Sequence, residues 1–108
     1  MERLYKKNQE LTAVFVASDE MAVGAITYLH EQGVRVPEQI SVLGFDNTKI
    51  SRMFIPKLST VAQPMYEIGN EAVVILNSIL NGEKLKNTKC YLPHEIIERD
   101  SVCSLKSK

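Results

Sequence analysis

The chain has 108 residues, of which 44% are hydrophobic and 24% charged, a composition typical of one small folded domain. Thirteen basic residues balance thirteen acidic ones, so the chain carries no excess positive charge with which to bind a nucleic-acid backbone. Two cysteines, Cys90 and Cys103, make no disulfide framework, and no apolar run approaches the roughly 18 residues of a membrane span, so the sequence favours a cytoplasmic protein without a membrane partner.

The first elements predict a strand that leads into a helix. Residues 1–10 pattern as the last turns of a helix with a polar face. Residues 12–17 ("TAVFVA") are apolar on both alternating faces, which is typical of a parallel strand that is covered on both sides. Ser18 or Asp19 then caps a helix whose acidic first turn suits the positive end of the helix dipole. Gly33 is expected to end this helix in a left-handed conformation.

The rest of the chain continues the alternation of strands and helices. Residues 40–45 ("ISVLGF") form a second apolar strand, so this span is a βαβ unit with a right-handed crossover. The further expected elements are a loop with one helical turn over 48–56, a strand over 58–62, a helix over 65–81, and strand pieces over 89–92 and 94–98. This pattern predicts an α/β fold with a mainly parallel sheet.

Polar residues follow the first two predicted strands at the point where each strand ends. Ser18 and Asp19 follow the first strand, and Asp46 and Asn47 follow the second. Because parallel strands place their carboxyl ends at one edge of a sheet, we expect both pairs at the edge where ligands of open α/β sheets bind. A carboxylate accepts hydrogen bonds from neighbouring sugar hydroxyls and repels phosphate, and the sequence has no glycine-rich phosphate loop. A sugar-like ligand is therefore favoured over a nucleotide.

Both pairs also have a purely structural explanation. Asp19 can serve as a helix cap alone, and Asp46 with Asn47 can form a turn alone. Gly44 would allow either a helix or a ligand to approach the strand backbone closely. The sequence leaves these alternatives open.

The sequence contains no catalytic motif. His30 and His94 belong to no recognisable pattern, and Cys90 with His94 would suit a metal only on a helix, which Pro93 disfavours. Nucleophile and metalloprotease signatures do not occur. We therefore expect no enzymatic activity, no metal and no cofactor.

Met53, Phe54 and Ile55 are three consecutive large apolar residues in a predicted loop. Such a cluster marks either a protein interface or packing into the core, and the sequence favours neither. The helix after the first strand also has apolar residues on more than one face, which indicates two contacted surfaces. These residues are Met21, Val23, Ala25, Ile26 and Leu29.

Four stretches of the chain match one protein family in order and spacing. They are "TAVFVASDEMAVGAI", "GVRVPEQISVLGFDNTKIS", "IPKLSTVAQPMYEIGNEAV" and "YLPHEIIERDS", and together they cover nearly all of residues 11–101. On these stretches the chain resembles the lactose-repressor and galactose-repressor (LacI/GalR) family of bacterial transcription regulators. Within that family it is most similar to the catabolite-control and maltose-operon repressors.

The resemblance implies a fragment of a type I periplasmic-binding-protein fold, in which two α/β subdomains close around an effector. Residues 1–57 would be the second half of the C-terminal effector-binding subdomain. Residues 58–108 would contain the strand that crosses the hinge, a helix of the N-terminal subdomain and the C-terminal return segment. The DNA-binding headpiece and the first subdomain would precede this region in a longer chain.

The resemblance also assigns roles to single residues. Asp46 matches the family's aspartate that holds effector hydroxyls, and Ser18 matches a ligand-contacting position that is often asparagine. Asp19 and Asn47 complete the expected ligand-binding set. The dimer interface is expected at Ala22, Val23, Met53 and Phe54.

The implied function is the effector-binding and dimerisation part of a bacterial transcriptional repressor. Its partners would be a small sugar effector, a second copy of the chain, and operator DNA through the headpiece. In the catabolite-control branch, a phosphorylated carrier protein is a further partner that acts as corepressor. The main alternative is the solute-binding protein of a sugar transporter. Upstream residues separate the two, because a helix-turn-helix indicates a repressor and a signal peptide indicates a transporter.

Overall fold

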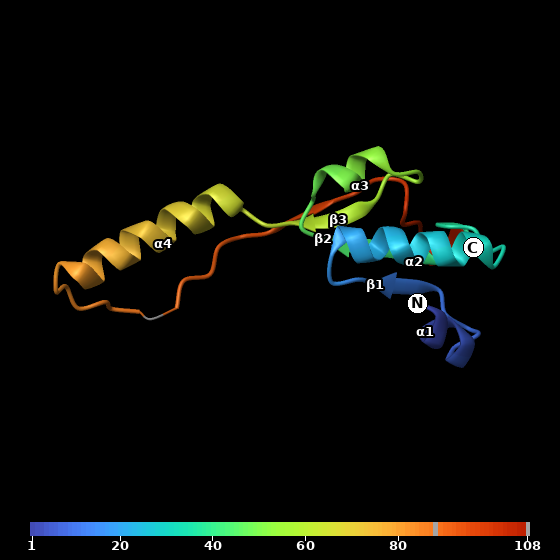
Figure 1. The fold of residues 1–108 in the computed structure, drawn as a ribbon, viewed down its shortest axis with the longest axis horizontal. Helices are drawn as coiled ribbons and strands as arrows, with labels where there is room; N and C mark the ends of the chain where they lie inside the picture. The colour runs from blue at the N-terminus through green and yellow to red at the C-terminus, as the bar shows by residue number, and fades with distance from the viewer. Residues whose placement is uncertain (88, 108) are drawn as a thin grey trace. The chain divides into compact units, whose positions relative to one another are not determined.

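The computed structural model describes residues 1–87 and 89–107. Its elements in chain order, drawn in Figure 1, are α1 (Glu2–Lys7), β1 (Ala13–Phe15), α2 (Asp19–Glu31), β2 (Ser41–Phe45), α3 (Lys49–Met53), β3 (Ser59–Ala62), α4 (Met65–Leu80), β4 (Glu95–Ile97) and the 3₁₀ helix η1 (Leu105–Ser107). The chain divides into a first unit, Met1–Ala62 with Glu95–Lys108, and a second unit, Gln63–His94.

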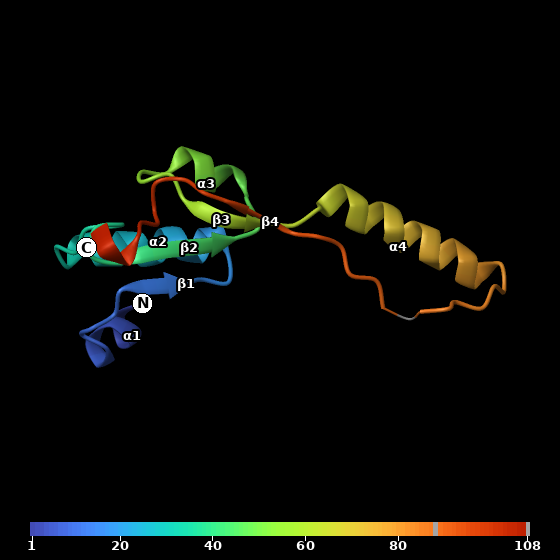
Figure 2. The ribbon, with the colours of Figure 1, turned by 180° about the vertical axis from the view of Figure 1, so that it is seen from behind.

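The four strands form one sheet in the order β1-β2-β3-β4. β1 pairs parallel with β2, and β2 pairs parallel with β3, whereas β4 runs antiparallel to β3. Figure 2 shows the arrows of β1, β2 and β3 pointing the same way, so their carboxyl ends share one edge of the sheet. The predicted α/β fold with a mainly parallel sheet is confirmed.

α2 begins and ends at the residues that local signals indicate. The hydroxyl of Ser18 accepts a hydrogen bond from the backbone N–H of Met21 (3.2 Å), so Ser18 is the N-cap and Asp19 is the first helical residue. Gly33 has a φ of 75°, and its N–H bonds to the carbonyl of His30, which closes the helix. Both ends of the predicted helix are therefore confirmed.

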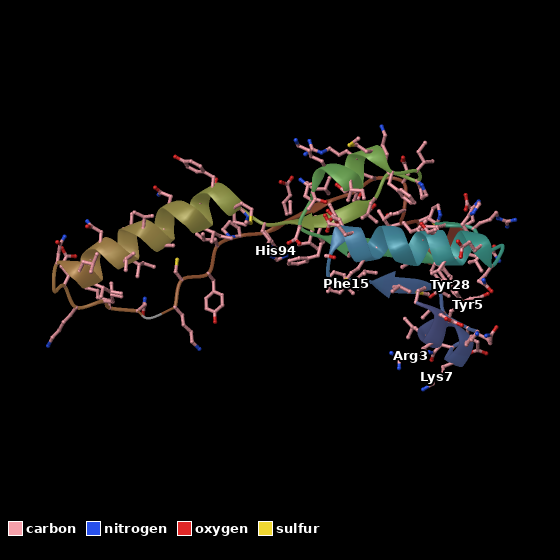
Figure 3. All side chains as sticks on the ribbon, viewed as in Figure 1. Arg3, Tyr5, Lys7, Phe15, Tyr28 and His94 are labelled. Atoms are coloured by element: carbon pink, nitrogen blue, oxygen red, sulfur yellow. The ribbon has the colours of Figure 1, made fainter. Side chains whose placement is uncertain are left out.

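The hydrophobic core of the first unit lies between α2 and one face of the sheet. α2 runs along β2, as the two opposite views in Figures 1 and 2 show. The buried apolar residues are Val16, Ala22, Ala25, Ile26, Leu29, Val34, Ile40, Val42 and Leu58. α1 joins this layer at its margin, where Tyr5 meets Tyr28 of α2 edge to face with ring centroids 6.3 Å apart (Figure 3).

The second face of β1 is open within the described residues, contrary to the expectation that both faces are covered. Phe15 is 63% exposed and touches Phe45 edge to face at 6.2 Å between ring centroids. A hollow of about 540 Å³ lies on this side of the sheet, lined in part by Phe15 and Leu43. This face of the sheet is open because α2 covers only the opposite face.

The segment after β4 completes the sheet beside β2. Ser101 is fully buried, and its carbonyl accepts the N–H of Val42 (2.8 Å). Its hydroxyl donates to the Val42 carbonyl (2.6 Å) and accepts the N–H of Ser59 (2.8 Å). The strand predicted over 94–98 is confirmed as β4. The strand predicted over 89–92 is wrong: the structure describes these residues as irregular, without a neighbouring strand to take their backbone hydrogen bonds.

The second unit consists of α4 and the irregular residues that follow it. α4 runs from Met65 to Leu80 with Asn81 as its C-cap, and Gly82 follows with a φ of 74°. The predicted helix over 65–81 is thus confirmed, and none of the residues of α4 is buried. The assignment of residues 1–57 and 58–108 to two subdomains stays a prediction. In the part of the chain that the structure describes, no helix is both long and apolar enough to span a membrane.

Candidate functional site

The carboxyl edge of the three parallel strands brings the predicted ligand-binding residues together. β1 is followed by Ser18 and Asp19, and its direct neighbour β2 is followed by Asp46 and Asn47. Neighbouring strands lie about 4.8 Å apart, so the ends of the two strands lie close enough to line one small site. The predicted placement of the two pairs at one edge is confirmed, whereas contact with a ligand stays a prediction.

Asp46 and Asn47 form a turn with an uncommon backbone conformation. Their φ angles are 99° and 56°, values that residues other than glycine rarely adopt. Among those residues, Asp and Asn tolerate positive φ angles best. Two hydrogen bonds hold the turn against β3: Asp46 N–H donates to the Val61 carbonyl (2.9 Å), and Asn47 N–H donates to Thr60 Oγ1 (3.3 Å). The surrounding structure therefore fixes the turn in a shape that the sequence alone disfavours.

Asp19 is a structural anchor of this turn. Its side chain has no exposed surface, and its carboxylate accepts hydrogen bonds from Thr48 N–H (2.7 Å), Thr48 Oγ1 (3.2 Å) and Thr60 Oγ1 (2.6 Å). Hydrogen bonds to a buried carboxylate are stronger than those between neutral groups. Asp19 thus joins the start of α2 to the loop after β2 and to β3.

Gly44 explains how Asp19 reaches this position. A Cβ atom at residue 44 would clash with Oδ1 of Asp19 and would lie 2.8 Å from Cδ2 of Leu58. Of the two explanations offered by the sequence, close approach of a helix to the strand is the one the structure supports.

The other ligand-binding candidates differ in exposure. The Asp46 side chain is exposed, while Ser18 and Asn47 are half-buried. Ser18 uses its hydroxyl oxygen to cap α2, which leaves its O–H able to donate. Asp46 and Asn47 are therefore the candidates that combine accessibility with a fixed backbone.

Arg99 is a residue of this site that the sequence did not indicate. Its Nη1 donates to Ser51 Oγ (3.0 Å) and to the Leu58 carbonyl (2.8 Å), and its Nη2 donates to Asn47 Oδ1 (2.8 Å). Arg99 and Asn47 are 52 positions apart in sequence. No local pattern marks such a pair, because only the pairing of β4 with β3 brings them together.

The four predicted interface residues lie in two environments. Ala22 has no exposed surface and belongs to the core, and Phe54 is half-buried and packs against that core. Val23 is half-buried, and Met53 is 78% exposed. Ile55, the third residue of the apolar cluster, is 85% exposed. The cluster therefore combines core packing at Phe54 with two accessible apolar side chains, and a role in dimerisation stays a prediction.

Among the residues that the structure describes, no three His, Cys, Asp or Glu side chains are arranged to hold a metal ion. The polar side chains at the carboxyl edge are carboxylates, an amide, hydroxyls and the guanidinium of Arg99. Such groups bind neutral hydroxylated molecules by hydrogen bonds.

Comparison with known proteins identifies the family. The family model described as "Periplasmic binding protein-like domain" matches residues 1–102. Catabolite control protein A from Priestia megaterium is 41% identical over 102 residues, which are 94% of this chain and 31% of that protein.

Solved structures agree with the match. The lac repressor dimer bound to operator and the anti-inducer ONPF has a TM-score of 0.84 at 32% identity, over 94% of this chain and 35% of that one. The complex of the transcriptional regulator CelR with cellobiose has a TM-score of 0.86 at 30% identity, over 93% of this chain and 31% of that one. The chain spans about a third of the length of the curated relatives it matches. On this evidence the chain belongs to the family of periplasmic-binding-protein-like domains, and it is similar to transcription regulators of the LacI family.

Proposed function

We propose that this chain is the effector-binding and dimerisation part of a bacterial transcriptional repressor whose effector is a sugar-like molecule. The observation that carries the proposal is the turn at Asp46 and Asn47, which holds an accessible carboxylate and an amide at the carboxyl edge of the parallel strands. A carboxylate and an amide in a fixed geometry suit the neighbouring hydroxyl groups of a sugar.

Relatives support both the sugar effector and the dimeric repressor in this proposal. CelR was solved with cellobiose, and the lac repressor was solved as a dimer on operator DNA. This chain carries no net charge, so operator binding would be the task of a headpiece outside it. A repressor acts on chromosomal DNA, so the proposed protein would act in the cytoplasm. The relatives are regulators, which favours this function over that of a transport protein or an enzyme.

The proposed mechanism is a shift in population between two closures of the effector cleft. A sugar that binds one closure more tightly increases the population of that closure. The change would alter the affinity of the dimer for its operator, and the coupling would be reciprocal. The resemblance to the catabolite-control branch adds a phosphorylated carrier protein as a proposed corepressor.

The decisive experiment titrates the full-length protein with neutral mono- and disaccharides, including cellobiose, by calorimetry. Asp46→Ala should weaken binding by about 100-fold, because it removes two charge-assisted hydrogen bonds. Asp100→Ala is the matched control, since Asp100 is also exposed but its contact with Lys57 is made by the backbone N–H. Unchanged affinity in Asp46→Ala would remove this carboxylate from the effector site.

A further inference from the structure

Arg99 connects three segments around the Asp46–Asn47 turn. Its guanidinium contacts the side chain of Asn47, the hydroxyl of Ser51 on α3 and the backbone carbonyl of Leu58 before β3. The backbone N–H of Arg99 is itself held by Ser59 Oγ at 2.8 Å. The backbone of Arg99 is therefore held against β3 while its guanidinium reaches across to the turn.

The contact with Arg99 decides the orientation of the Asn47 carboxamide. The oxygen and nitrogen ends of an asparagine side chain have nearly the same shape, so hydrogen-bond partners determine which end faces which neighbour. A guanidinium has donors and no acceptor, so the oxygen of Asn47 has to face Arg99. Ser51 Oγ lies 3.5 Å from the same oxygen. The two N–H donors of Asn47 consequently lie at the other end of the planar group, and the residue is only half-buried.

We propose that Arg99 is a positioning residue of the effector site, which fixes Asn47 so that its N–H donors, beside the Asp46 carboxylate, are presented to the ligand. The site would then offer one acceptor residue and one donor residue side by side. Such a pair suits a ligand with a hydroxyl next to a ring or carbonyl oxygen, as in a neutral sugar. This inference rests on the proposed function for the ligand, whereas the positioning of the turn can be tested without one.

The first experiment measures hydrogen exchange in the full-length protein without ligand. In Arg99→Met, amide exchange over residues 46–53 should rise by about tenfold or more, because the turn and the start of α3 lose a shared anchor. Arg52→Met is the matched control: it removes the same charge from an exposed position of α3 and should leave exchange over 46–53 unchanged. Exchange in Arg99→Met equal to that of the wild type would overturn the proposal.

The second experiment separates orientation from simple stabilisation by using Asn47→Asp. An aspartate at this position still accepts hydrogen bonds from Arg99, so exchange over 46–53 should stay at the wild-type level. The aspartate side chain has no N–H donors, so the affinity for the sugar that binds the wild type most tightly should fall by about tenfold. Wild-type affinity in Asn47→Asp would refute the donor role.

The two proposals fail in different ways. If the wild type binds none of the sugars tested, the proposal of a sugar effector fails. The hydrogen-exchange measurement still tests whether Arg99 positions the turn. If the wild type binds a sugar and Arg99→Met binds it equally well, the sugar-binding function stands and the inference about Arg99 fails.

Discussion

Gly44 of β2 lies against Asp19, the first residue of α2. Both atoms that a Cβ would meet are buried and hold fixed positions, since Asp19 is bonded to Thr48 and Thr60, and Leu58 is part of the core. Neither neighbour can move without breaking other contacts. The absence of a side chain at residue 44 is thus a requirement of the packing.

We expect Gly44→Ala to lower the free energy of unfolding of the full-length protein by about 1–3 kcal/mol, the usual cost of overpacking a core. Gly24→Ala is the matched control, because a Cβ at this exposed position of α2 would meet no atom within 4 Å. That change should raise stability by up to about 1 kcal/mol, since alanine favours helix over glycine. Urea denaturation measures both, and equal effects would contradict the packing argument.

Single residues show where sequence reasoning stops. Asp46 and Asn47 could be placed at the carboxyl edge, because they follow a recognisable strand. The buried bonds of Asp19 and the reach of Arg99 could not be predicted, since both depend on side chains 29 or more positions apart in sequence. A charged residue near a strand gives no local sign of its distant partners.

The segment after β4 stabilises the first unit by its hydrogen bonds to β2 and β3. Ser101 links β2 to β3 through its hydroxyl, and Cys103 N–H donates to Ser41 Oγ at 3.1 Å. These contacts occupy the part of β2 that precedes its pairing with β3. The segment therefore satisfies backbone groups that would otherwise be left without partners.

We expect Ser101→Ala to destabilise the full-length protein by about 1–3 kcal/mol, because it leaves the buried Ser59 N–H without an acceptor. Ser104→Ala serves as the control, since Ser104 is exposed and accepts one bond from the nearby Lys106 N–H. Thermal unfolding compares the two, and similar melting temperatures for both variants would argue against the bridging role of Ser101.

At the level of elements, the sequence predicts helices better than strands. The ends of α2 follow from Ser18 and Gly33, which act within one helical turn. A strand requires a partner that local sequence does not specify, so residues 89–92 have strand-forming composition but no strand. β1 is shorter than its apolar run over 12–17, although the Thr12 carbonyl and the Val16 N–H still bond to β2.

For the whole molecule, the accessible apolar residues at the end of α3, Met53 and Ile55, are predicted to contact a second copy. We expect Met53→Asp to weaken self-association of the full-length protein, since Met53 is 78% exposed and an unpaired carboxylate is costly in an apolar interface. Phe54→Asp should do the same but should also lower stability, because Phe54 packs against the core. Analytical ultracentrifugation measures both effects on association.

Leu105→Asp provides the control for this comparison, because Leu105 is 67% exposed and lies on η1 rather than beside α3. It should sediment as the wild type does. A wild-type sedimentation profile for Met53→Asp and Phe54→Asp would place the contact between copies elsewhere.

The bond between Ser101 and Val42 spans 59 positions of the chain, and it has a consequence for biosynthesis. A ribosome makes β2 and β3 well before Ser101, so the nascent polypeptide holds an unfinished sheet until translation of this region is almost over. A premature stop codon after α4 would release a product that can never close its first unit. Such a product would be a substrate for cellular proteases, even though every residue of the Asp46–Asn47 turn had been made.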